Sequence, residues 1–440
     1  MKIKKSDYKK IIADIGFIVL GIFLFWTMML FKQWYLIWIC FFPLFYVIKK
    51  NNFLNSIIYS FVFVVFLNFT SFLWFIKEGW NIFFISIFLM WLLLILFSFF
   101  VKLFSSNKLK SIISFPFFWT AMLFLFSFLF PKFGNLWFNF AFFQPELAFF
   151  IFYIKPAGLT FLIMLCNSLI ANYIYYKDKK IIYFAIALLI LVFGLNYIYV
   201  DNDNYQKEIK FALIQGNFNE TWAWRSNNYE QVFQTYEKLS LDAGEKNPDF
   251  IIWPEYSIVH DIFENESLMK RIGSIANRTN SYLIIGGFSL EKSADGSYSG
   301  DRADTAFIFS PEGKLINTYN SVKPYPLDLS ILPGNNSFVI NTEKGNFIII
   351  MCYEEFVYDL NDEIYKNADF IVSMTNNQVF DRTFGIELIS LFTRLKASEK
   401  GKPLVRVTNT GISQVIDKNG KIIAKLEPYK KDYLIGEIKF

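Results

Sequence analysis

Cys352 is the only cysteine after residue 200, and it ends an apolar run, Ile349-Ile350-Met351-Cys352, that is followed by Tyr353-Glu354-Glu355. A β-rich run that delivers a lone thiol to a polar turn is typical of a nucleophilic cysteine. The whole chain has one histidine, His260, so the sequence offers only one candidate partner for the common cysteine–histidine pair. The proton of a catalytic Cys352 would have to be handled by a carboxylate and a lysine.

Two further segments supply these groups. The run Ile251-Ile252-Trp253-Pro254-Glu255 ends with an acid directly after a proline, and Lys323 lies in the proline-stiffened loop Tyr319–Leu327. We expect Glu255 to take the thiol proton and later to activate the second nucleophile. Lys323 would favour the thiolate and, with the backbone N–H of Tyr353, hold the oxyanion of an acyl intermediate. A strand-end Glu or a loop Lys is by itself usually solvated surface, and a lone buried Cys is usually an inert hydrophobe. The three together predict an active site.

The elements that must position these groups follow a polar linker at residues 201–208. Short apolar runs predict eight strands, at residues 209–215, 250–253, 282–286, 305–309, 347–352, 370–374, 404–408 and 411–416. Amphipathic stretches predict four helices, at residues 228–243, 267–279, 359–367 and 386–400. Short β-rich runs interspersed with helices indicate a layered α/β or α+β domain over residues 209–440. Arg394 and Lys396, on the last of these helices, are expected to form a solvated or headgroup-binding face.

The first 200 residues have the composition of a membrane domain. The chain is 54% hydrophobic, with 55 phenylalanines and only 18% charged residues, where soluble chains carry about a quarter. Apolar stretches near the length of a bilayer span predict about seven spans within residues 1–200, at residues 11–31, 34–48, 53–76, 80–101, 111–130, 156–176 and 181–200. Residues 133–154 do not fit as a further full span because Pro145 interrupts them. A re-entrant or interfacial segment and two short helices meeting at a proline loop are both compatible with this stretch.

The distribution of charge orients these spans. Lysines gather before the first span and after the second, fourth and sixth, whereas the alternate loops are poorer in them. The positive-inside rule then puts the amino terminus in the cytoplasm and everything after residue 200 on the opposite side. Residues 1–200 hold 17 Lys and 5 acidic residues, a net charge of +12, so the total of +5 leaves −7 for residues 201–440. This charge pattern argues against nucleic acid as a partner. The sequence shows no metal-ligand spacing and no phosphate-binding glycine loop, so we expect neither a metal nor a cofactor.

Three segments of the sequence resemble apolipoprotein N-acyltransferase. They are Trp253-Pro254-Glu255, Cys352-Tyr353-Glu354, and the stretch from Ser373-Met374-Thr375-Asn376 to Pro403–Gly411. Supporting matches are Ala212–Asn217 and Phe115–Trp119. The resemblance covers nearly the whole chain, and the first two motifs in this order behind a set of spans are specific to the family.

The resemblance implies a polytopic α-helical membrane domain followed by a nitrilase-like αββα sandwich, on the periplasmic side of the bacterial inner membrane. The matching motifs imply Glu255 as general base and Cys352 as nucleophile of a Glu-Lys-Cys triad whose lysine would be Lys323, with Tyr353 and Glu354 at further active-site positions. The implied reaction takes an acyl chain from a phospholipid as a Cys352 thioester and passes it to the N-terminal amino group of diacylglyceryl-cysteine in an apolipoprotein. Both substrates are held in the lipid bilayer, which fits the predicted spans.

The sequence departs from the family at several points. The family's lysine motif reads roughly Tyr-x-Lys-x-His-Leu-Val-Pro-Phe-Gly-Glu, whereas here Ser321 follows Tyr319-Asn320 and Lys323 lies two positions late. Either a local deletion brings Lys323 into place, or Ser321 has replaced the lysine. The tryptophan expected near the lipid entry is absent from Asn376–Asp381, and the family's eighth, carboxy-terminal span has no counterpart before Phe440.

Two other functions remain open at this point. A membrane-tethered nitrilase-type amidase would need the same triad and would use water as the second nucleophile, but it has no use for the spans. A non-enzymatic scaffold or binding module would explain the shifted lysine but not the intact Cys352 and Glu255. The sequence favours the acyltransferase. The position of the Lys323 side chain would separate the scaffold from both enzymes.

Overall fold

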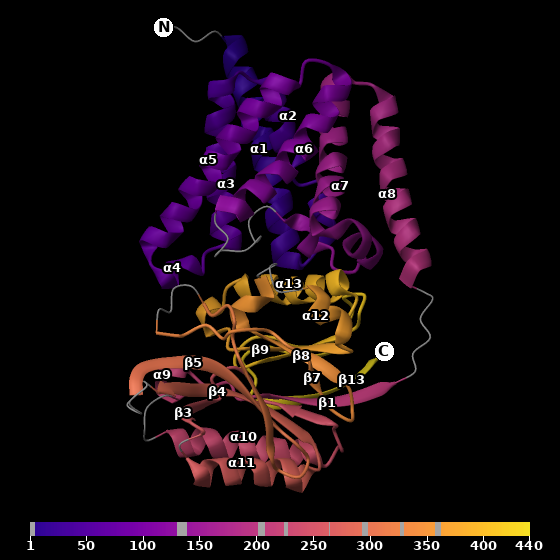
Figure 1. Ribbon diagram of the computed structural model, residues 1–440. Helices are drawn as coiled ribbons and strands as arrows, with labels where there is room; N and C mark the ends of the chain where they lie inside the picture. Colours follow the sequence, from indigo (N-terminus) through magenta and orange to yellow (C-terminus); the bar gives the residue numbers. More distant parts are fainter. Residues whose placement is uncertain are drawn as a thin grey trace. The chain divides into compact units, whose positions relative to one another are not determined.

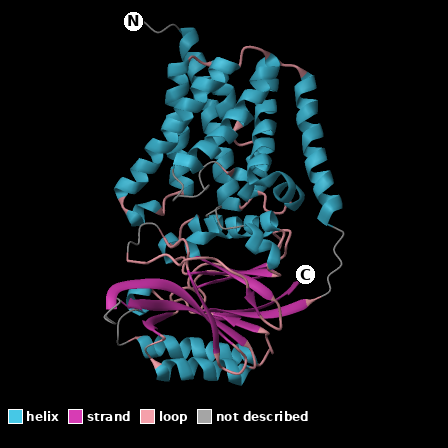
Figure 2. Ribbon diagram, viewed as in Figure 1, coloured by secondary structure: helices cyan, strands magenta, loops and turns pink. Residues whose placement is uncertain are grey.

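The chain is described by a computed structural model at residues 5–129, 139–200, 207–223, 228–263, 265–292, 298–325, 330–356 and 362–440. It forms two compact units, one of residues 1–202 with 382–391, the other of residues 203–381 with 392–440. The described part of the first unit is helical, whereas the second holds the described strands (Figures 1 and 2). Each unit is built around its own buried apolar side chains.

The first unit is built from apolar helices. In the part of the chain that the structure describes, six are long and apolar enough to cross a membrane: Tyr8–Phe31, Phe53–Ser71, Trp80–Phe104, Lys108–Leu129, Ala148–Tyr176 and Lys179–Tyr199. The elements of this unit are α1 (Lys5–Phe31), η1 (Trp34–Trp38), α2 (Phe42–Lys50), α3 (Phe53–Ser71), α4 (Phe75–Glu78), α5 (Trp80–Phe104), α6 (Lys108–Leu129), η3 (Phe140–Phe143), α7 (Ala148–Tyr176) and α8 (Lys179–Val200). The lengths of these apolar helices make the unit a multi-pass membrane domain.

Residues 34–48, predicted as one span, do not form one continuous helix. They divide between η1 and α2, and Pro43 lies in the first turn of α2. A helix break at membrane depth leaves backbone N–H groups that need partners. Asn167 of α7 supplies one, because its Oδ1 accepts the N–H of Phe41 at 2.8 Å and that of Phe42 at 2.9 Å.

The segment predicted to be re-entrant or interfacial, residues 133–154, is described from Asn139 onward. Its η3 turn is buried within the unit. The helix that begins at Ala148 is interrupted at Lys155, whose φ of 62° and ψ of 166° are not helical, directly before Pro156. A proline inside a helix removes a backbone hydrogen bond and clashes with the preceding turn. The described part of the segment therefore adds no further helix of spanning length.

The second unit contains two β-sheets. One has the strand order β13-β1-β2-β4-β5-β6 with β3 paired to β4, and the other has the order β12-β11-β10-β9-β8-β7. The strands are β1 (Glu208–Gln215), β2 (Phe250–Ile252), β3 (Ile258–Asp261), β4 (Tyr282–Lys292), β5 (Tyr298–Phe309), β6 (Leu315–Asn320), β7 (Ile340–Asn341), β8 (Asn346–Met351), β9 (Phe370–Thr375), β10 (Leu404–Thr408), β11 (Ser413–Ile416), β12 (Ile422–Leu426) and β13 (Asp432–Lys439). The helices are α9 (Glu220–Ala223), α10 (Tyr229–Gly244), α11 (Glu266–Thr279), η4 (Cys352–Phe356), α12 (Asp362–Asn367), η5 (Gln378–Phe380) and α13 (Gly385–Lys400). Helix α13 belongs to this unit only from residue 392 onward.

Parallel strands lie in the middle of both sheets. Strands β1, β2 and β4 run parallel in the first sheet, and β8, β9 and β10 run parallel in the second. The carboxyl ends of parallel strands meet at one edge of a sheet, where α/β proteins place their sites. Glu255 follows β2, Cys352 follows β8, Asn376 follows β9 and Asn409 follows β10. The topology therefore gathers these four residues at the carboxyl ends of the parallel strands.

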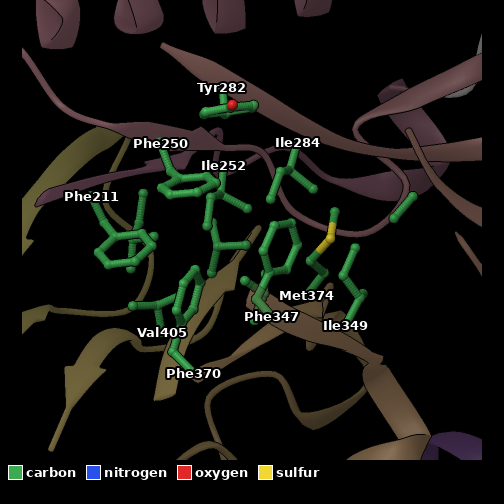
Figure 3. Close-up of a cluster of buried hydrophobic side chains, with 14 of the residues drawn as sticks. Phe211, Phe250, Ile252, Tyr282, Ile284, Phe347, Ile349, Phe370, Met374 and Val405 are labelled. Carbon is green, nitrogen blue, oxygen red and sulfur yellow. The ribbon is translucent and has the colours of Figure 1, made fainter. Parts of the chain in front are cut away.

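Three buried clusters hold the layers of this unit together. The central cluster lies between the two sheets and takes side chains from both, among them Phe250 and Phe370 (Figure 3). A second cluster lies between the first sheet and helices α10 and α11, and a third lies between the second sheet and helices α12 and α13 (Figure 1). The layers follow the order helix, sheet, sheet, helix, so the predicted αββα sandwich is confirmed.

Each predicted strand and helix of this unit overlaps an observed element, but five strands have no predicted counterpart: β3, β6, β7, β12 and β13. Strands β12 and β13 are the end strands of their sheets. Their side chains alternate between exposed and more buried positions, and charged residues interrupt the apolar ones. An end strand of this kind lacks the continuous apolar run that marks the central, parallel strands.

Phe250→Ala tests the central cluster. The Phe250 ring centroid lies 5.4 Å from that of Phe211, 5.1 Å from Tyr282 and 5.6 Å from both Phe347 and Phe370. Because the truncation leaves a cavity between the sheets, we expect the free energy of unfolding to fall by about 3–5 kcal/mol. A lower thermal unfolding midpoint, followed by tryptophan fluorescence in detergent, would report this loss.

Ile423→Ala on β12 is the control, since this side chain is 48% exposed. Its effect should stay within about 0.5 kcal/mol. Equal midpoints for the two variants would contradict the assignment of Phe250 to the centre of the sandwich.

Candidate active site

Glu255 is positioned by the rigid end of strand β2. The residue that follows β2, Trp253, is fully buried. Trp253 donates its Nε1–H to Ser240 Oγ at 2.7 Å and stacks on Tyr236, with ring centroids 4.9 Å apart. Its backbone N–H donates to the carbonyl oxygen of Ile284 on β4 at 2.8 Å. These contacts fix the chain two residues before Glu255.

Gly286 on β4 allows the Glu255 segment to approach this strand closely. A Cβ at Gly286 would lie 2.4 Å from the carbonyl oxygen of Pro254 and 2.7 Å from the Cα of Glu255. The carbonyl oxygen of Gly286 also accepts the hydroxyl of Ser257 at 2.8 Å. The backbone on both sides of Glu255 is therefore packed against one residue that has no side chain.

The carboxyl group of Glu255 is buried and contacts three groups. Glu255 is 3% exposed. Its Oε2 accepts the backbone N–H of Asn376 at 2.8 Å. Its side chain also forms hydrogen bonds with the side chains of Cys352 and Asp304. The structure thus brings the predicted base and the predicted nucleophile together, and it adds Asp304, which the sequence analysis missed.

Cys352 lies where strand β8 turns into η4, and its φ is 42°. For a residue with a side chain, this left-handed backbone costs about 1–3 kcal/mol, and active sites are among the places where such residues cluster. Burial raises the pKa of the Cys352 thiol well above its usual value, and the carboxyl groups of Glu255, Asp304 and Glu355 raise that pKa further. The thiol is therefore protonated at neutral pH, and a reaction through it needs a base.

Glu354 joins the cysteine turn to the loop that carries Lys323. Its side chain is fully buried. Its Oε1 accepts the backbone N–H of Val322 at 2.6 Å and that of Lys323 at 3.1 Å, and its Oε2 accepts the N–H of Met351 at 2.7 Å. Burial raises the pKa of Glu354, while these backbone N–H donors act in the opposite direction. One carboxyl group thus sets the distance between two loops.

Two hydroxyl groups from β6 and its following loop bind the same carboxylate. Tyr319 donates its hydroxyl to both oxygens at 2.9 Å, and Ser321 donates to Oε1 of Glu354 at 3.2 Å. Ser321 is 1% exposed, whereas Lys323 is partly buried. The hydroxyl of Ser321, one of the two candidates for the position of the family's lysine, is therefore engaged with Glu354. The long side chain of Lys323 begins two residues further along the loop.

Tyr353 packs between these loops. Its ring centroid lies 6.1 Å from that of Tyr325 and 6.0 Å from that of Phe356. The structure therefore places Tyr353, Glu354 and the backbone of Lys323 in one cluster beside the cysteine turn. The continuation of the lysine loop, residues 326–329, lies outside the described residues.

A buried ion pair behind the cysteine turn was not predicted. Glu355 and Arg406 both have fully buried side chains, and the Nε–H of Arg406 donates to Glu355 Oε1 at 2.9 Å. Arg406 also donates to Asn377 Oδ1 at 2.8 Å and to the carbonyl oxygen of Ile412 at 3.0 Å. Removal of one partner from such a pair costs about 3–5 kcal/mol. The signal in the sequence was a single charged residue within the apolar strand β10.

The prediction that Arg394 and Lys396 form a solvated or headgroup-binding face is wrong. These residues are only 7% and 6% exposed. Arg394 donates its Nε–H to the carbonyl oxygen of Gly420 at 2.8 Å, and Lys396 donates from Nζ to that of Glu354 at 3.4 Å. Burial lowers the pKa of Lys396 to about 8. Helix α13 thus presents these long side chains to carbonyl groups inside the unit, which spacing along the helix does not reveal.

Within the described residues, no group of three or more His, Cys, Asp or Glu side chains could hold a metal ion. The chemistry that the site offers is that of a thiol beside a buried carboxyl group. This arrangement suits acyl transfer through a thioester. The roles of Glu255, Lys323, Cys352, Tyr353 and Glu354 in such a reaction remain predictions.

Comparison with known proteins defines the class. Residues 210–440 match the carbon-nitrogen hydrolase family, and the chain belongs to that family. The chain is also similar to the Nit3 protein of Saccharomyces cerevisiae, a member of the nitrilase superfamily. The two are 20% identical, with a TM-score of 0.42 and coverage of 54% of this chain and 92% of that one.

Curated relatives narrow the resemblance. The chain is 28% identical to the apolipoprotein N-acyltransferase of Haemophilus ducreyi over 308 residues, which cover 64% of this chain and 60% of that relative. It is 26% identical to the apolipoprotein N-acyltransferase of Geobacter metallireducens over 316 residues, covering 64% and 59%. The matched part thus spans about 60% of the length of these relatives. The predicted resemblance to apolipoprotein N-acyltransferases is confirmed.

Glu354→Gln tests the link between the two loops. The glutamine side chain would keep one oxygen that accepts hydrogen bonds. Its NH₂ group would replace the other oxygen of Glu354 and would face N–H donors that it cannot accept. We expect faster hydrogen exchange in peptides that contain Val322 and Lys323, by about tenfold or more. Hydrogen exchange followed by mass spectrometry of the detergent-purified protein measures this change.

Tyr319→Phe is the matched control, because it removes one hydroxyl donor and leaves both backbone donors their acceptor. Its effect on the same peptides should be smaller. Unchanged exchange in the glutamine variant would show that Glu354 does not hold this loop.

Proposed function

We propose that this chain transfers a fatty acyl chain from a membrane phospholipid, through a thioester on Cys352, to the N-terminal amino group of diacylglyceryl-cysteine in apolipoproteins. The observation that carries the proposal is the hydrogen bond between the Cys352 side chain and buried Glu255. Six helices of spanning length in the described part of the chain suit substrates that stay in a bilayer. The curated relatives bear the name of this activity.

In the first half-reaction, Glu255 takes the thiol proton as the Cys352 sulfur attacks the ester carbonyl of the phospholipid. The carbonyl oxygen becomes an oxyanion, which the ammonium of Lys323 and the backbone N–H of Tyr353 would stabilise. The tetrahedral intermediate collapses, the carbon–oxygen ester bond breaks, and Glu255 returns its proton to the departing lysophospholipid. The acyl chain is left on sulfur as a thioester.

In the second half-reaction, the amino group of the acceptor replaces the thiol as nucleophile. Glu255 takes one proton from this amine as its nitrogen attacks the thioester carbonyl, and the same donors hold the second oxyanion. The carbon–sulfur bond breaks, an amide forms, and the proton returns to Cys352. One carboxyl group therefore serves both halves without net proton uptake.

The proposal includes a location. The lysine-rich segments before the first span and after the second, fourth and sixth predicted spans support a cytoplasmic amino terminus. Residue 200 ends the sixth spanning helix of the described part. We count residues 34–48, divided between η1 and α2, as one further crossing, which makes seven. An odd number of crossings from a cytoplasmic amino terminus assigns the second unit to the periplasmic side of the bacterial inner membrane, where it would meet exported lipoproteins.

Cys352→Ala tests the thioester. After incubation of the detergent-purified protein with phospholipid, we expect intact-mass spectrometry to show an added fatty-acyl mass on the wild type only. Hydroxylamine should remove this mass, because it cleaves thioesters. Cys166→Ala, in the first unit, is the matched control and should load normally. Absence of the adduct on well-folded wild-type protein across several phospholipid classes would contradict the proposal and favour a scaffold.

Lys323→Met tests the assignment of the lysine. Loss of an oxyanion donor typically slows acyl transfer by about 10²- to 10³-fold, and we expect a loss of this size in the rate of acyl loading on Cys352. Ser321→Ala is the control for the competing assignment and should slow loading much less. The opposite order of the two variants would assign the oxyanion contact to the Ser321 position.

A further inference from the structure

Asp304 lies at the buried end of the site and has no assigned role. It is on β5, where alternation along the strand puts it on the same face as Ala306 and Ile308, which belong to the central cluster between the sheets. It is 2% exposed. Its register partner on the neighbouring strand β4 is Phe288. Asp304 thus places a carboxyl group on the same inner face of the sheet as these apolar side chains.

The surroundings of Asp304 are those of a neutral acid. Its side chain forms a hydrogen bond with the side chain of Glu255. Its Oδ1 has no hydrogen-bond partner among the described residues. Two ionised carboxylates have no hydrogen between them and only accept hydrogen bonds, so a hydrogen bond between two carboxyl groups requires one shared proton.

The distribution of donors indicates which of the two groups carries this proton. Glu255 receives the backbone N–H of Asn376 at 2.8 Å and a hydrogen bond from the thiol of Cys352. A carboxylate is stabilised where donors point at it, and a buried charge without donors is costly. The proton therefore belongs on Asp304. Burial and the proximity of Glu255 raise the pKa of Asp304 well above its usual value, which agrees with this assignment.

We propose that Asp304 is a positioning residue for the general base: it stays protonated, donates to Glu255, and forms with it a dyad that carries one proton and one negative charge. This inference rests on the proposed role of Glu255 as the base toward Cys352. When the thiol proton moves to Glu255, the dyad becomes fully protonated and the only new charge is on sulfur. Ionised Asp304 would place a second negative charge beside the forming thiolate and oppose this step.

Other charged or titratable groups lie near the dyad. The charge of Glu354, on the cysteine turn, raises the pKa of Asp304, and the charge of Arg302, on strand β5 like Asp304, lowers it. Tyr319 on β6 donates its hydroxyl to Glu354, and Tyr256, which follows Glu255, stacks on Phe288 with centroids 4.8 Å apart. Lys323 donates its backbone N–H to Glu354.

Asp304→Asn tests the proton directly, because the amide keeps an N–H donor to Glu255 but has no acid to ionise. We expect the infrared spectrum of full-length wild-type protein at neutral pH to contain the carbonyl stretch of a protonated carboxylic acid, and the variant to lack it. Asp249→Asn is the matched control. Asp249 is a carboxylate paired with Lys344 at 2.6 Å, so its replacement should leave the band in place. A band of equal intensity in wild type and Asp304→Asn overturns the proposal.

The pH dependence of Cys352 reactivity gives a second test that needs no lipid substrate. The rate of alkylation by iodoacetamide reports the thiolate, and peptide mapping separates Cys352 from Cys40 and Cys166. In the wild type, Asp304 ionises as the pH rises and opposes thiolate formation. In Asp304→Asn this second charge cannot form, so the rise in alkylation should occur at lower pH. Superimposable profiles overturn the proposal.

Acyl loading separates this proposal from the proposed function. Asp304→Ala should slow loading by about 10- to 100-fold, the range of a lost hydrogen bond to a charged group, and Asp304→Asn should recover most of that loss because it restores the donor. Equal losses in the two variants overturn the positioning role. Absence of loading on the wild type, with the infrared and alkylation results as expected, overturns the transfer reaction and leaves the dyad supported.

Discussion

The buried carboxylate of Glu354 is the interaction on which the geometry of the site depends. It belongs to the cysteine turn, yet its donors include the backbone of Val322 and Lys323, about 30 residues earlier in the chain. A buried carboxylate that lost these donors would be costly, so the two loops are held in one arrangement. The thiol on one loop and the lysine on the other then have a fixed separation of their backbones. Catalysis by such groups depends on this kind of positioning.

The site holds four buried carboxyl groups within one unit: Glu255, Asp304, Glu354 and Glu355. Each meets the cost of burial in a different way. Glu355 has a cation, because Arg406 lies beside it. Glu354 has backbone and hydroxyl donors in place of a cation. Glu255 and Asp304 face each other, and the group that receives fewer donors is the one that keeps a proton. The result is a polar site with little free charge, in which one further charge can form on sulfur.

Much of this arrangement was predictable from the sequence, because the signals were local. A continuous apolar run marks a buried strand, and a strand end marks the edge at which Cys352 and Glu255 meet. The partner of Asp304 could not be read in the same way, since it depends on which strand lies beside β5 and on which face of β5 turns inward. Arg394 and Lys396 were misassigned for a related reason. Their charge predicted exposure to solvent, and only the packing of α13 shows that both side chains donate hydrogen bonds to buried carbonyl groups. The helix break within residues 34–48 was not predicted, because it depends on a side chain more than 120 residues away, Asn167, which accepts the free backbone N–H groups.

The raised pKa of Cys352 also affects how readily its thiol is oxidised. Peroxide and disulfide exchange act on the thiolate and hardly at all on the thiol. A nucleophilic cysteine that remains protonated until its base takes the proton therefore reacts slowly with oxidants and disulfides between catalytic cycles. Many enzymes gain reactivity by holding a permanent thiolate, and they need a reducing environment to keep it. The carboxyl groups around Cys352 have the opposite effect, because they raise its pKa. They would allow this free cysteine to persist in the oxidising compartment that we propose for the second unit.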